Sequence, residues 1–176
     1  VGYDKENAVA ERARAIGVVD EAAGDFKSAV QNASLIVLAT PVGAIGELCA
    51  QLNADAAPGA LIIDVGSVKG AIVEAAKSLR DDLHFVPCHP VAGTEQSGPE
   101  AGFATLFKDR WCIVTPLARE DDAYKASVTN AKALWEAAGA HVEGPPMTSS
   151  RSRKEKSSNI PLAVSGTSPA SPPPTR

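Results

Sequence analysis

Three side chains that can bind a substrate or move a proton follow two strand-like segments of this sequence. Ser67 and Lys69 come just after the apolar run at 61–65, and His89 comes just after the run at 85–88. A neutral imidazole serves as a general base near neutral pH, and a serine hydroxyl can orient a polar substrate. In an open parallel sheet, ligands bind at the carboxyl ends of the strands. The sequence therefore predicts that these side chains meet in one crevice.

Each of these residues also has a structural alternative. Ser67 is placed to cap the helix that is expected from Lys69 onward, and Lys69 would then be a solvated surface lysine. The alternative for His89 is a polar residue at a strand end whose hydrogen bonds the fold satisfies. His89 is nevertheless better placed for chemistry, because Pro90 and Gly93 restrict the shape of the loop expected around it.

The segments that must position these residues alternate between strand and helix patterns. Four apolar runs without polar alternation are typical of strands covered on both faces, and the stretches between them carry apolar residues at helical spacing. The runs lie at 35–39, 61–65, 85–88 and 111–114, and the predicted helices lie at 6–16, 42–52, 69–79 and 121–138. This alternation predicts a doubly wound, mostly parallel α/β sheet of the Rossmann type, with Trp111 and Trp135 in its core.

Asp4 follows Val1–Tyr3, which has the pattern of the end of a strand just before a helix. At the end of the second strand of a dinucleotide fold, an acidic residue binds the ribose and repels a 2′-phosphate, which favours NAD over NADP. Asp4 is also placed to cap the following helix, and one carboxylate can do both. The Gly-x-Gly-x-x-Gly turn expected about 20 residues upstream is not in the sequence. Residues 1–146 are therefore expected to form a partial dinucleotide-binding domain that lacks its first strand and glycine-rich loop.

Composition argues against several classes of protein. Residues 1–146 hold 20 of the 21 acidic residues and 12 of the 17 basic ones. Such an acidic body argues against nucleic acid as a partner. Cys49, Cys88 and Cys112 are odd in number and lie in apolar surroundings, which fits reduced thiols better than disulfides or a metal site. Because no export signal or membrane-length apolar run is present, we expect a cytoplasmic location and no membrane partner.

Residues 147–176 differ sharply in composition from the rest of the chain. They carry five basic residues and one acidic residue, and the stretch at 168–174 consists mostly of serine and proline. Such a sequence sustains neither helix nor strand, so this tail is expected to be disordered. Because the change is abrupt, we also expect that the tail is an out-of-frame translation or the product of a truncated gene.

Four ordered motifs resemble the prephenate dehydrogenase family, which includes the arogenate and cyclohexadienyl dehydrogenases. The motifs lie at 64–69, 88–98, 103–107 and 111–116, and the resemblance covers residues 1–146. It implies an oxidative decarboxylation of prephenate or arogenate in tyrosine biosynthesis, with NAD or NADP as the cofactor and a small molecule as the substrate. It also implies that intact members form homodimers through a second, helical domain, for which the sequence after 146 shows no pattern.

The resemblance assigns roles to individual residues. It implies that His89 bonds the ring hydroxyl and takes its proton, and that Ser67 helps to hold that hydroxyl and the nicotinamide. It further places Gly93, Thr94 and Glu95 at the substrate pocket, and Asp4, Thr40 and Pro41 beside the cofactor. Because a phosphate-binding loop and a carboxylate clamp are both lacking, the chain alone is expected to be inactive and to bind NAD weakly.

Two alternatives stay open at this point. One is another two-domain NAD-dependent dehydrogenase of the β-hydroxyacid type, which uses a lysine of its helical domain and does not need the motif at 89–93. The other is a non-catalytic remnant of a dinucleotide fold, which packs against a full-length partner through exposed apolar surface.

Overall fold

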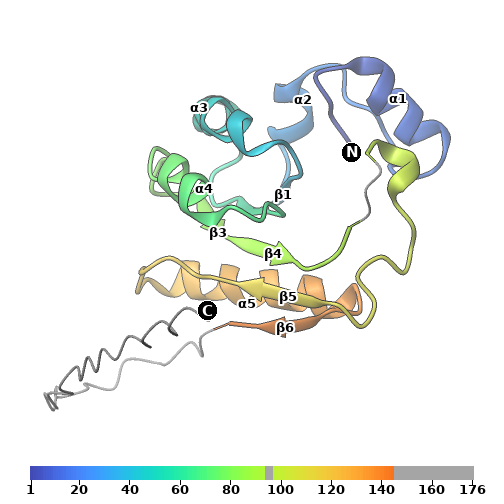
Figure 1. Ribbon diagram of the computed structural model, residues 1–176. Helices are drawn as coiled ribbons and strands as arrows, with labels where there is room; N and C mark the ends of the chain where they lie inside the picture. The colour runs from blue at the N-terminus through green and yellow to red at the C-terminus, as the bar shows by residue number, and fades with distance from the viewer. Residues whose placement is uncertain (94–96, 145–176) are drawn as a thin grey trace, which may run out of the picture.

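The computed structural model describes residues 1–93 and 97–144, so the predicted tail at 147–176 lies outside it. The strands are β1 (Leu35–Leu38), β2 (Leu61–Asp64), β3 (His84–Val86), β4 (Cys88–Pro90), β5 (Trp111–Val114) and β6 (His141–Glu143). The helices are α1 (Asn7–Ala15), α2 (Phe26–Val30), α3 (Ile45–Asp55), α4 (Lys69–Ala76) and α5 (Asp122–Ala137), with 3₁₀ turns η1 (Val42–Ala44) and η2 (Pro99–Ala101). From β1 to β3 strands and helices alternate along the chain, and α3 and α4 lie on the opposite side of the strands from the long helix α5 (Figure 1).

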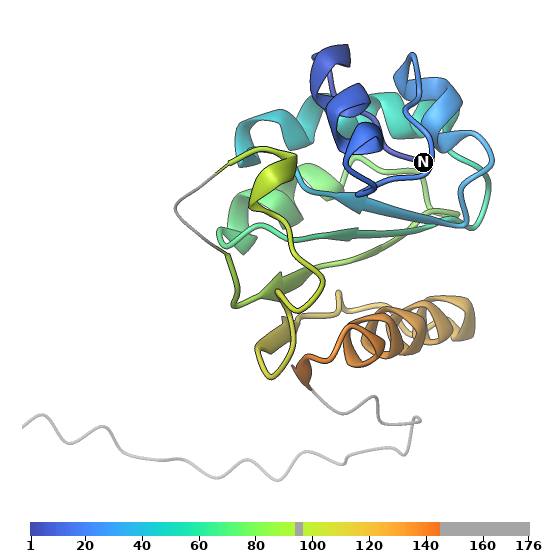
Figure 2. The same cartoon turned by 90° about the vertical axis from the view of Figure 1, so that its right-hand side faces the viewer.

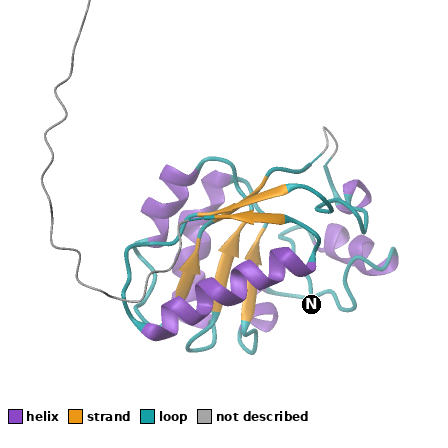
Figure 3. Cartoon of the chain, turned by 90° about the horizontal axis from the view of Figure 1, so that it is seen from below, coloured by secondary structure: helices purple, strands orange, loops and turns teal. Residues whose placement is uncertain are grey.

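Strands β1, β2 and β3 form a parallel sheet in that order. In this sheet Leu35 pairs with Leu61, and Ile62 pairs with Phe85. All residues of β2 are buried, because α3 and α4 pack on one face of the sheet and α5 packs on the other. Figure 3 shows α5 lying across the strands on this second face. The doubly wound arrangement predicted from the sequence is confirmed.

Two strands are covered by other elements on one face only. Their apolar runs had predicted that both faces would be covered. β1 alternates between buried and exposed residues and leaves Leu35 and Val37 outside. β5 alternates in the same way, and the side chain of Trp111 is 55% exposed, so its predicted place in the core is wrong. Trp135 of α5 is buried as predicted.

The strand pairing changes partner at Pro87, which lies between β3 and β4. β3 pairs with β2, whereas β4 runs antiparallel to β5, and β6 adds to this second sheet parallel to β5. Proline has no N–H for a ladder, but the carbonyl of Pro87 accepts the N–H of Thr115 at 2.9 Å. The prediction of one strand at 85–88 followed by a loop is wrong. Pairing with β5 extends the strand and places His89 opposite Ile113.

The N-terminal segment forms a short parallel bridge between Gly2 and Ala22. Helix α1 follows and is capped by Gly17, whose φ of +76° is the left-handed conformation typical of a helix end. Within the described residues, β1 has no strand beside it on the side away from β2. In the order 3-2-1-4-5-6 of a dinucleotide fold, the first strand belongs between the Gly2 segment and β1. The expected Rossmann-type sheet is therefore confirmed, and its first strand is not among the residues that the structure describes.

The predicted helices are confirmed with shifted ends. Helix α4 ends at Ala76 rather than at Leu79, and the helix predicted at 42–52 begins as the 3₁₀ turn η1 before it continues as α3. Helix α2 was not predicted, because five residues are too few to show a helical period. Its start is nevertheless marked by Asp25, whose carboxylate accepts the N–H of Ser28 at 2.8 Å.

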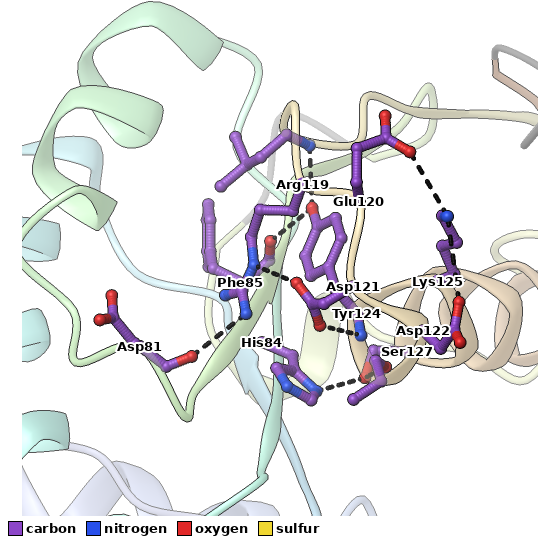
Figure 4. Close-up of polar contacts among 12 residues, drawn as sticks. Asp81, His84, Phe85, Arg119, Glu120, Asp121, Asp122, Tyr124, Lys125 and Ser127 are labelled. Carbon is purple, nitrogen blue, oxygen red and sulfur yellow. Dashed lines mark hydrogen bonds and ion pairs between the residues drawn. The ribbon is translucent and has the colours of Figure 1, made fainter. Parts of the chain in front are cut away.

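A polar cluster fastens the first half of α5 to β3 (Figure 4). The hydroxyl of Tyr124 donates to the carbonyl of Phe85 at 3.0 Å and accepts the N–H of Leu117 at 2.8 Å. Nδ1 of His84 lies 2.6 Å from Oγ of Ser127. Tyr124 is fully buried, so these bonds satisfy polar groups inside the core. The cluster serves to hold α5 in place, at the start of β3 and away from the carboxyl ends of the parallel strands.

Candidate active site

A buried carboxylate stands at the end of β2. Asp64 is fully buried, and its Oδ2 atom accepts the N–H of Gly66 at 2.9 Å. Its Oδ1 atom accepts the N–H of Cys88 at 3.2 Å, where β4 begins. Strands β2 and β3 pair only as far as Ile63 and Val86, so the side chain of Asp64 continues the connection where the ladder stops. One carboxylate thus joins the loop after β2 to the start of β4.

Lys69, in the first turn of α4, adds further hydrogen bonds to this connection. Its Nζ atom donates to Oδ2 of Asp64 and to the carbonyl oxygen of Cys88. The Lys69 side chain is 21% exposed, so the alternative of a solvated surface lysine is wrong. A buried carboxylate is costly without a cationic partner, and Lys69 supplies one. Sequence reasoning missed this pair, whose signal is an aspartate within an otherwise apolar run.

The loop after β2 passes too close to its neighbours for a side chain at Gly66. A Cβ atom there would lie 2.5 Å from Cδ1 of Ile72 and 3.3 Å from Oδ2 of Asp64. Both distances are shorter than ordinary van der Waals contact, so a side chain at position 66 would force Ile72 and Asp64 to shift. This close approach sets the position of Ser67, the next residue.

Ser67 is exposed, and its hydroxyl makes no hydrogen bond to the part of the chain that the structure describes. Helix α4 begins at Lys69 with Val68 as its N-cap, and no side chain caps it. The alternative in which Ser67 caps this helix is therefore wrong. Its hydroxyl stands at the carboxyl end of β2, free to meet a ligand.

His89 lies in the middle of β4, on the face of the sheet opposite α5. Residues paired directly across an antiparallel ladder point to the same face. The partner of His89 is Ile113, which is 42% exposed, whereas Cys88 and Cys112 on the other face are buried against α5. The Nδ1 atom of His89 is buried and makes no hydrogen bond to any described residue. Such an unpaired nitrogen is uncommon in a fold and marks His89 as a functional candidate.

The neighbouring cysteine is unsuited to nucleophilic chemistry. Burial raises the pKa of the Cys88 thiol to about 11, and the thiol donates to the carbonyl of Val86 at 3.3 Å. The thiolate is the reactive form of cysteine, so Cys88 stays unreactive at neutral pH.

The residues predicted to lie beside a dinucleotide follow other strands of the sheet. Asp4 precedes α1, and its Oδ1 atom accepts the N–H of Glu6 at 2.9 Å. The N-cap of α1 is Glu6, and no side chain caps this helix, so the predicted capping role of Asp4 is wrong. Thr40 and Pro41 follow β1 and are exposed, and the carbonyl of Pro41 accepts the N–H of Ala44 at 2.9 Å as η1 begins. The turn that starts at Pro41 keeps both residues at the carboxyl end of β1.

This edge of the sheet fits two parts of a dinucleotide. The Oδ2 atom of Asp4 makes no hydrogen bond to the described residues and suits a ribose hydroxyl. Thr40 and Ser67 stand where β1 and β2 end, which is where the other half of a dinucleotide binds in this fold. Among residues 1–93 and 97–144, no Gly-x-Gly-x-x-Gly turn opens a helix for a pyrophosphate.

The loop that leaves β4 returns to α1. Gly93 has a φ of +146°, which favours glycine, and Thr94 and Glu95 lie outside the described residues. Beyond them, Glu100 of η2 forms an ion pair with Arg12 of α1, with 2.5 Å between Oε1 and Nε. Figures 1 and 2 both show η2 beside α1. Sequence reasoning missed this link between η2 and α1.

A cavity of about 840 Å³ opens where β4 ends, within the usual size range of small-molecule sites. Val91–Gly93, Phe103, Lys108 and Arg110 are among the residues that line it. Neither Lys108 nor Arg110 forms an ion pair or a side-chain hydrogen bond within the described parts of the chain. Two unpaired cations on one cavity of an acidic domain favour an anionic ligand there.

A second, apolar groove of about 460 Å³ lies between the sheet and α5. Val37 and Ile63 line it from the sheet, and Leu134 and Trp135 line it from the helix. The groove adjoins the open side of β1.

None of the described helices is both long enough and apolar enough to cross a membrane. Over the same residues, no three histidine, cysteine, aspartate or glutamate side chains gather as metal ligands would. Cys49, Cys88 and Cys112 are all buried free thiols, as the sequence predicted.

The parallel sheet and the residues at its carboxyl edge define a Rossmann-type dinucleotide-binding domain. More narrowly, the family model described as "Prephenate dehydrogenase, nucleotide-binding domain" matches residues 1–144, and the chain belongs to this family. This membership favours the prephenate dehydrogenase interpretation over the β-hydroxyacid type.

Similar proteins support this assignment. The chain is 38% identical over 143 residues to a cyclohexadienyl dehydrogenase of Zymomonas mobilis, a match that covers 80% of this chain and 47% of that protein. The crystal structure of Synechocystis arogenate dehydrogenase matches with a TM-score of 0.73 and 30% identity, over 82% of this chain and 50% of that one. The structure of A. aeolicus prephenate dehydrogenase in complex with hydroxyphenyl propionate and NAD+ matches with a TM-score of 0.72 and 29% identity, over 82% and 49%. The chain thus spans about half the length of these relatives.

Proposed function

We propose that this chain is the nucleotide-binding part of an enzyme that oxidatively decarboxylates prephenate or arogenate with NAD, in the synthesis of tyrosine. The observation that carries the proposal is His89, whose buried Nδ1 atom lacks a partner among the described residues. The family membership of the chain and the cationic cavity after β4 support it.

In the proposed reaction, the ring carbon that bears the hydroxyl group loses a hydride. The ring carboxylate leaves as carbon dioxide, and the ring becomes aromatic. As the hydride leaves, His89 accepts the hydroxyl proton, because a neutral imidazole is an effective base near neutral pH, and it returns this proton to the ring oxygen when carbon dioxide has left. Ser67 hydrogen-bonds the same hydroxyl and fixes its direction. NAD, when bound, supplies the hydride acceptor.

The cofactor assignments follow the carboxyl edge of the sheet. Asp4 binds the ribose with its free carboxylate oxygen, and Thr40, Pro41 and Ser67 lie beside the nicotinamide half. The negative charge of Asp4 repels a 2′-phosphate, so NAD is preferred and NADP is the weaker cofactor.

The substrate assignments follow the loop after β4. Gly93 leads into Thr94 and Glu95, which we assign to the substrate pocket. Lys108 and Arg110 line the cavity that starts at the same loop. Prephenate and arogenate carry carboxylates, and the two cations suit such anions.

The chain on its own is expected to bind NAD weakly and to show no turnover. Its described residues provide no glycine-rich turn at a helix N-terminus for the pyrophosphate, and such a turn supplies much of the binding to a dinucleotide. Substrate oxidation by the 176-residue chain alone would contradict this part of the proposal.

A chimera tests the function directly. Residues 1–144 replace the matching segment of the Zymomonas mobilis cyclohexadienyl dehydrogenase, whose remaining residues complete the protein. We expect the chimera to form NADH from NAD with prephenate or arogenate, and the substrate that it uses distinguishes the two. A chimera that folds and binds NAD but oxidises neither compound would overturn the proposal.

A further inference from the structure

We propose that Lys69 is a positioning residue, which holds Ser67 and His89 in a fixed relation through the Asp64 carboxylate and the Cys88 peptide. The inference rests on the proposed function for the roles of Ser67 and His89, whereas the contacts of Lys69 are independent of it. In this proposal the ammonium group of Lys69 touches neither substrate nor cofactor.

The pair of Lys69 and Asp64 holds Cys88 from both sides. The N–H of Cys88 donates to Oδ1 of Asp64 at 3.2 Å, and the carbonyl of Cys88 accepts from Nζ of Lys69. That carbonyl belongs to the planar peptide bond that joins Cys88 to His89. Lys69 therefore sets the plane of this peptide, and with it the direction in which His89 leaves the strand. On the other edge of β4, pairing of Cys88 with Val114 completes the restraint.

The same pair holds the loop that carries Ser67. Gly66, just before Ser67, donates its N–H to Oδ2 of Asp64 at 2.9 Å. Lys69, two residues after Ser67, donates to the same oxygen. One carboxylate therefore restrains the loop on both sides of Ser67, and the serine and the histidine share one anchor.

Stability alone does not account for this pair. The cost of removing two charges from water offsets most of their attraction, and an apolar pair of similar volume often serves a fold equally well. Charge-assisted hydrogen bonds provide defined direction, which apolar contacts lack. The pair connects the segments that carry Ser67 and His89, and the proposed reaction needs these two side chains to keep a fixed orientation.

The competing assignment is direct contact between Lys69 and a ligand. An ammonium group has three donors, and Lys69 uses at least two of them, on Asp64 and on Cys88. If Lys69 only contacted a ligand, its substitution would weaken ligand binding and leave the ligand-free protein unchanged. A positioning role is visible in the protein alone, and this difference decides the experiment.

NMR of the full 176-residue chain, without cofactor or substrate, tests the proposal. In Lys69→Met we expect the amides of Gly66 and Cys88 to exchange with solvent about tenfold faster, because local opening is less opposed. We also expect the ring resonance of His89 to move. Lys69→Arg is expected to restore both signals. The matched control is Lys77→Met, at the end of the same helix and at the surface, which is expected to change neither.

The proposal is overturned if a folded Lys69→Met variant keeps wild-type exchange at Gly66 and Cys88 and an unmoved His89 resonance. It is also overturned if Lys69→Arg behaves like Lys69→Met. The ring resonances of His84 and His141 show whether the whole chain has loosened, and both are expected to stay in place.

If Lys69→Met alone does not fold, the double variant Asp64→Asn with Lys69→Met removes both charges and leaves no unpaired carboxylate. The expectation for the double variant is the same faster exchange at Cys88, and wild-type exchange there overturns the proposal. Because no ligand is used, failure of this test and failure of the chimera test are distinguishable.

Discussion

The Oδ1 atom of Asp64 accepts the N–H of Cys88 at 3.2 Å, just beyond the last paired residues of β2 and β3. A side chain thus does here what a backbone carbonyl does within the ladder. Pro87 interrupts the edge of the strand at this point, and the carboxylate restores a connection on its far side. The buried charge is tolerated because Lys69 and two backbone N–H groups surround it.

Removal of this carboxylate is expected to destabilise the fold. In Asp64→Ala, Lys69 loses its charge partner and two backbone N–H groups lose their acceptor. We expect the free energy of unfolding to fall by about 3–5 kcal/mol, as for other broken buried pairs. Urea denaturation measures the loss. The control is Asp55→Ala. In the wild type, the Asp55 carboxylate lies 3.9 Å from Nζ of Lys27, and such a surface pair contributes about 0–1 kcal/mol to the free energy of unfolding. Equal losses in the two variants would contradict the prediction.

The hydroxyl of Tyr124 is expected to contribute to stability through two backbone groups. Tyr124→Phe leaves the carbonyl of Phe85 and the N–H of Leu117 without this partner inside the core. Unpaired buried polar groups cost about 1–3 kcal/mol, so the urea midpoint should drop accordingly. Tyr3→Phe, at a side chain that is 40% exposed, serves as the control and should leave the midpoint unchanged. A midpoint in Tyr124→Phe equal to that of the wild type would contradict this account.

The sequence predicted the layers of the fold more reliably than the exposure of individual strands. The run at 61–65 predicted β2 and its burial correctly, because a central strand is covered on both faces. The similar run at 111–114 lies on a strand with one open face, so Trp111 is exposed. Which faces are covered depends on neighbouring elements that a local pattern does not contain.

Within the candidate site, positions were predicted better than contacts. Ser67 lies at a strand end as expected, whereas His89 lies inside β4, because the distant strand β5 extends the pairing beyond Pro87. The role of Lys69 was also missed. Its partners lie five residues back at Asp64 and across the sheet at Cys88, and only the folded chain brings them together.

The buried thiols are expected to make the fold sensitive to alkali. Burial raises the pKa of Cys88 to about 11 and that of Cys112 to about 12, from an ordinary value of 9.0. In the unfolded chain both thiols ionise near pH 9, whereas in the fold they stay protonated to higher pH. Ionisation therefore favours the unfolded chain as the pH rises from 9.0 towards these raised values. The free energy of unfolding should fall there by up to about 1.4 kcal/mol per pH unit for each thiol.

Urea titrations below and above pH 9 measure this slope. The double variant Cys88→Ala with Cys112→Ala removes both ionising groups and should have a flatter pH dependence than the wild type. Any cost of the smaller side chains lowers its stability at every pH and does not affect the comparison of slopes. An equally steep slope in the double variant would assign the alkaline sensitivity to other groups.

The open side of β1 is expected to make the chain associate with itself. Val37 is 47% exposed and lines the apolar groove next to a strand edge that has no partner within the described residues. Exposed apolar surface and free strand edges both promote association. Val37→Lys should shift sedimentation velocity profiles towards the monomer. Val18→Lys, at a 54% exposed side chain outside the groove, should not. Equal behaviour of the two variants would place the association elsewhere.

His89 is expected to be essential for turnover in the chimera that carries residues 1–144. His89→Asn keeps a polar side chain of similar reach but removes the base, so kcat/KM should fall by a factor of about 100–10,000. Steady-state rates of NADH formation measure the loss. The control is His84→Asn, which disturbs the contact with Ser127 at the start of β3 and should lower stability without lowering turnover of the folded enzyme. If the His89→Asn chimera turns over as fast as the unsubstituted chimera, this histidine has no part in the mechanism.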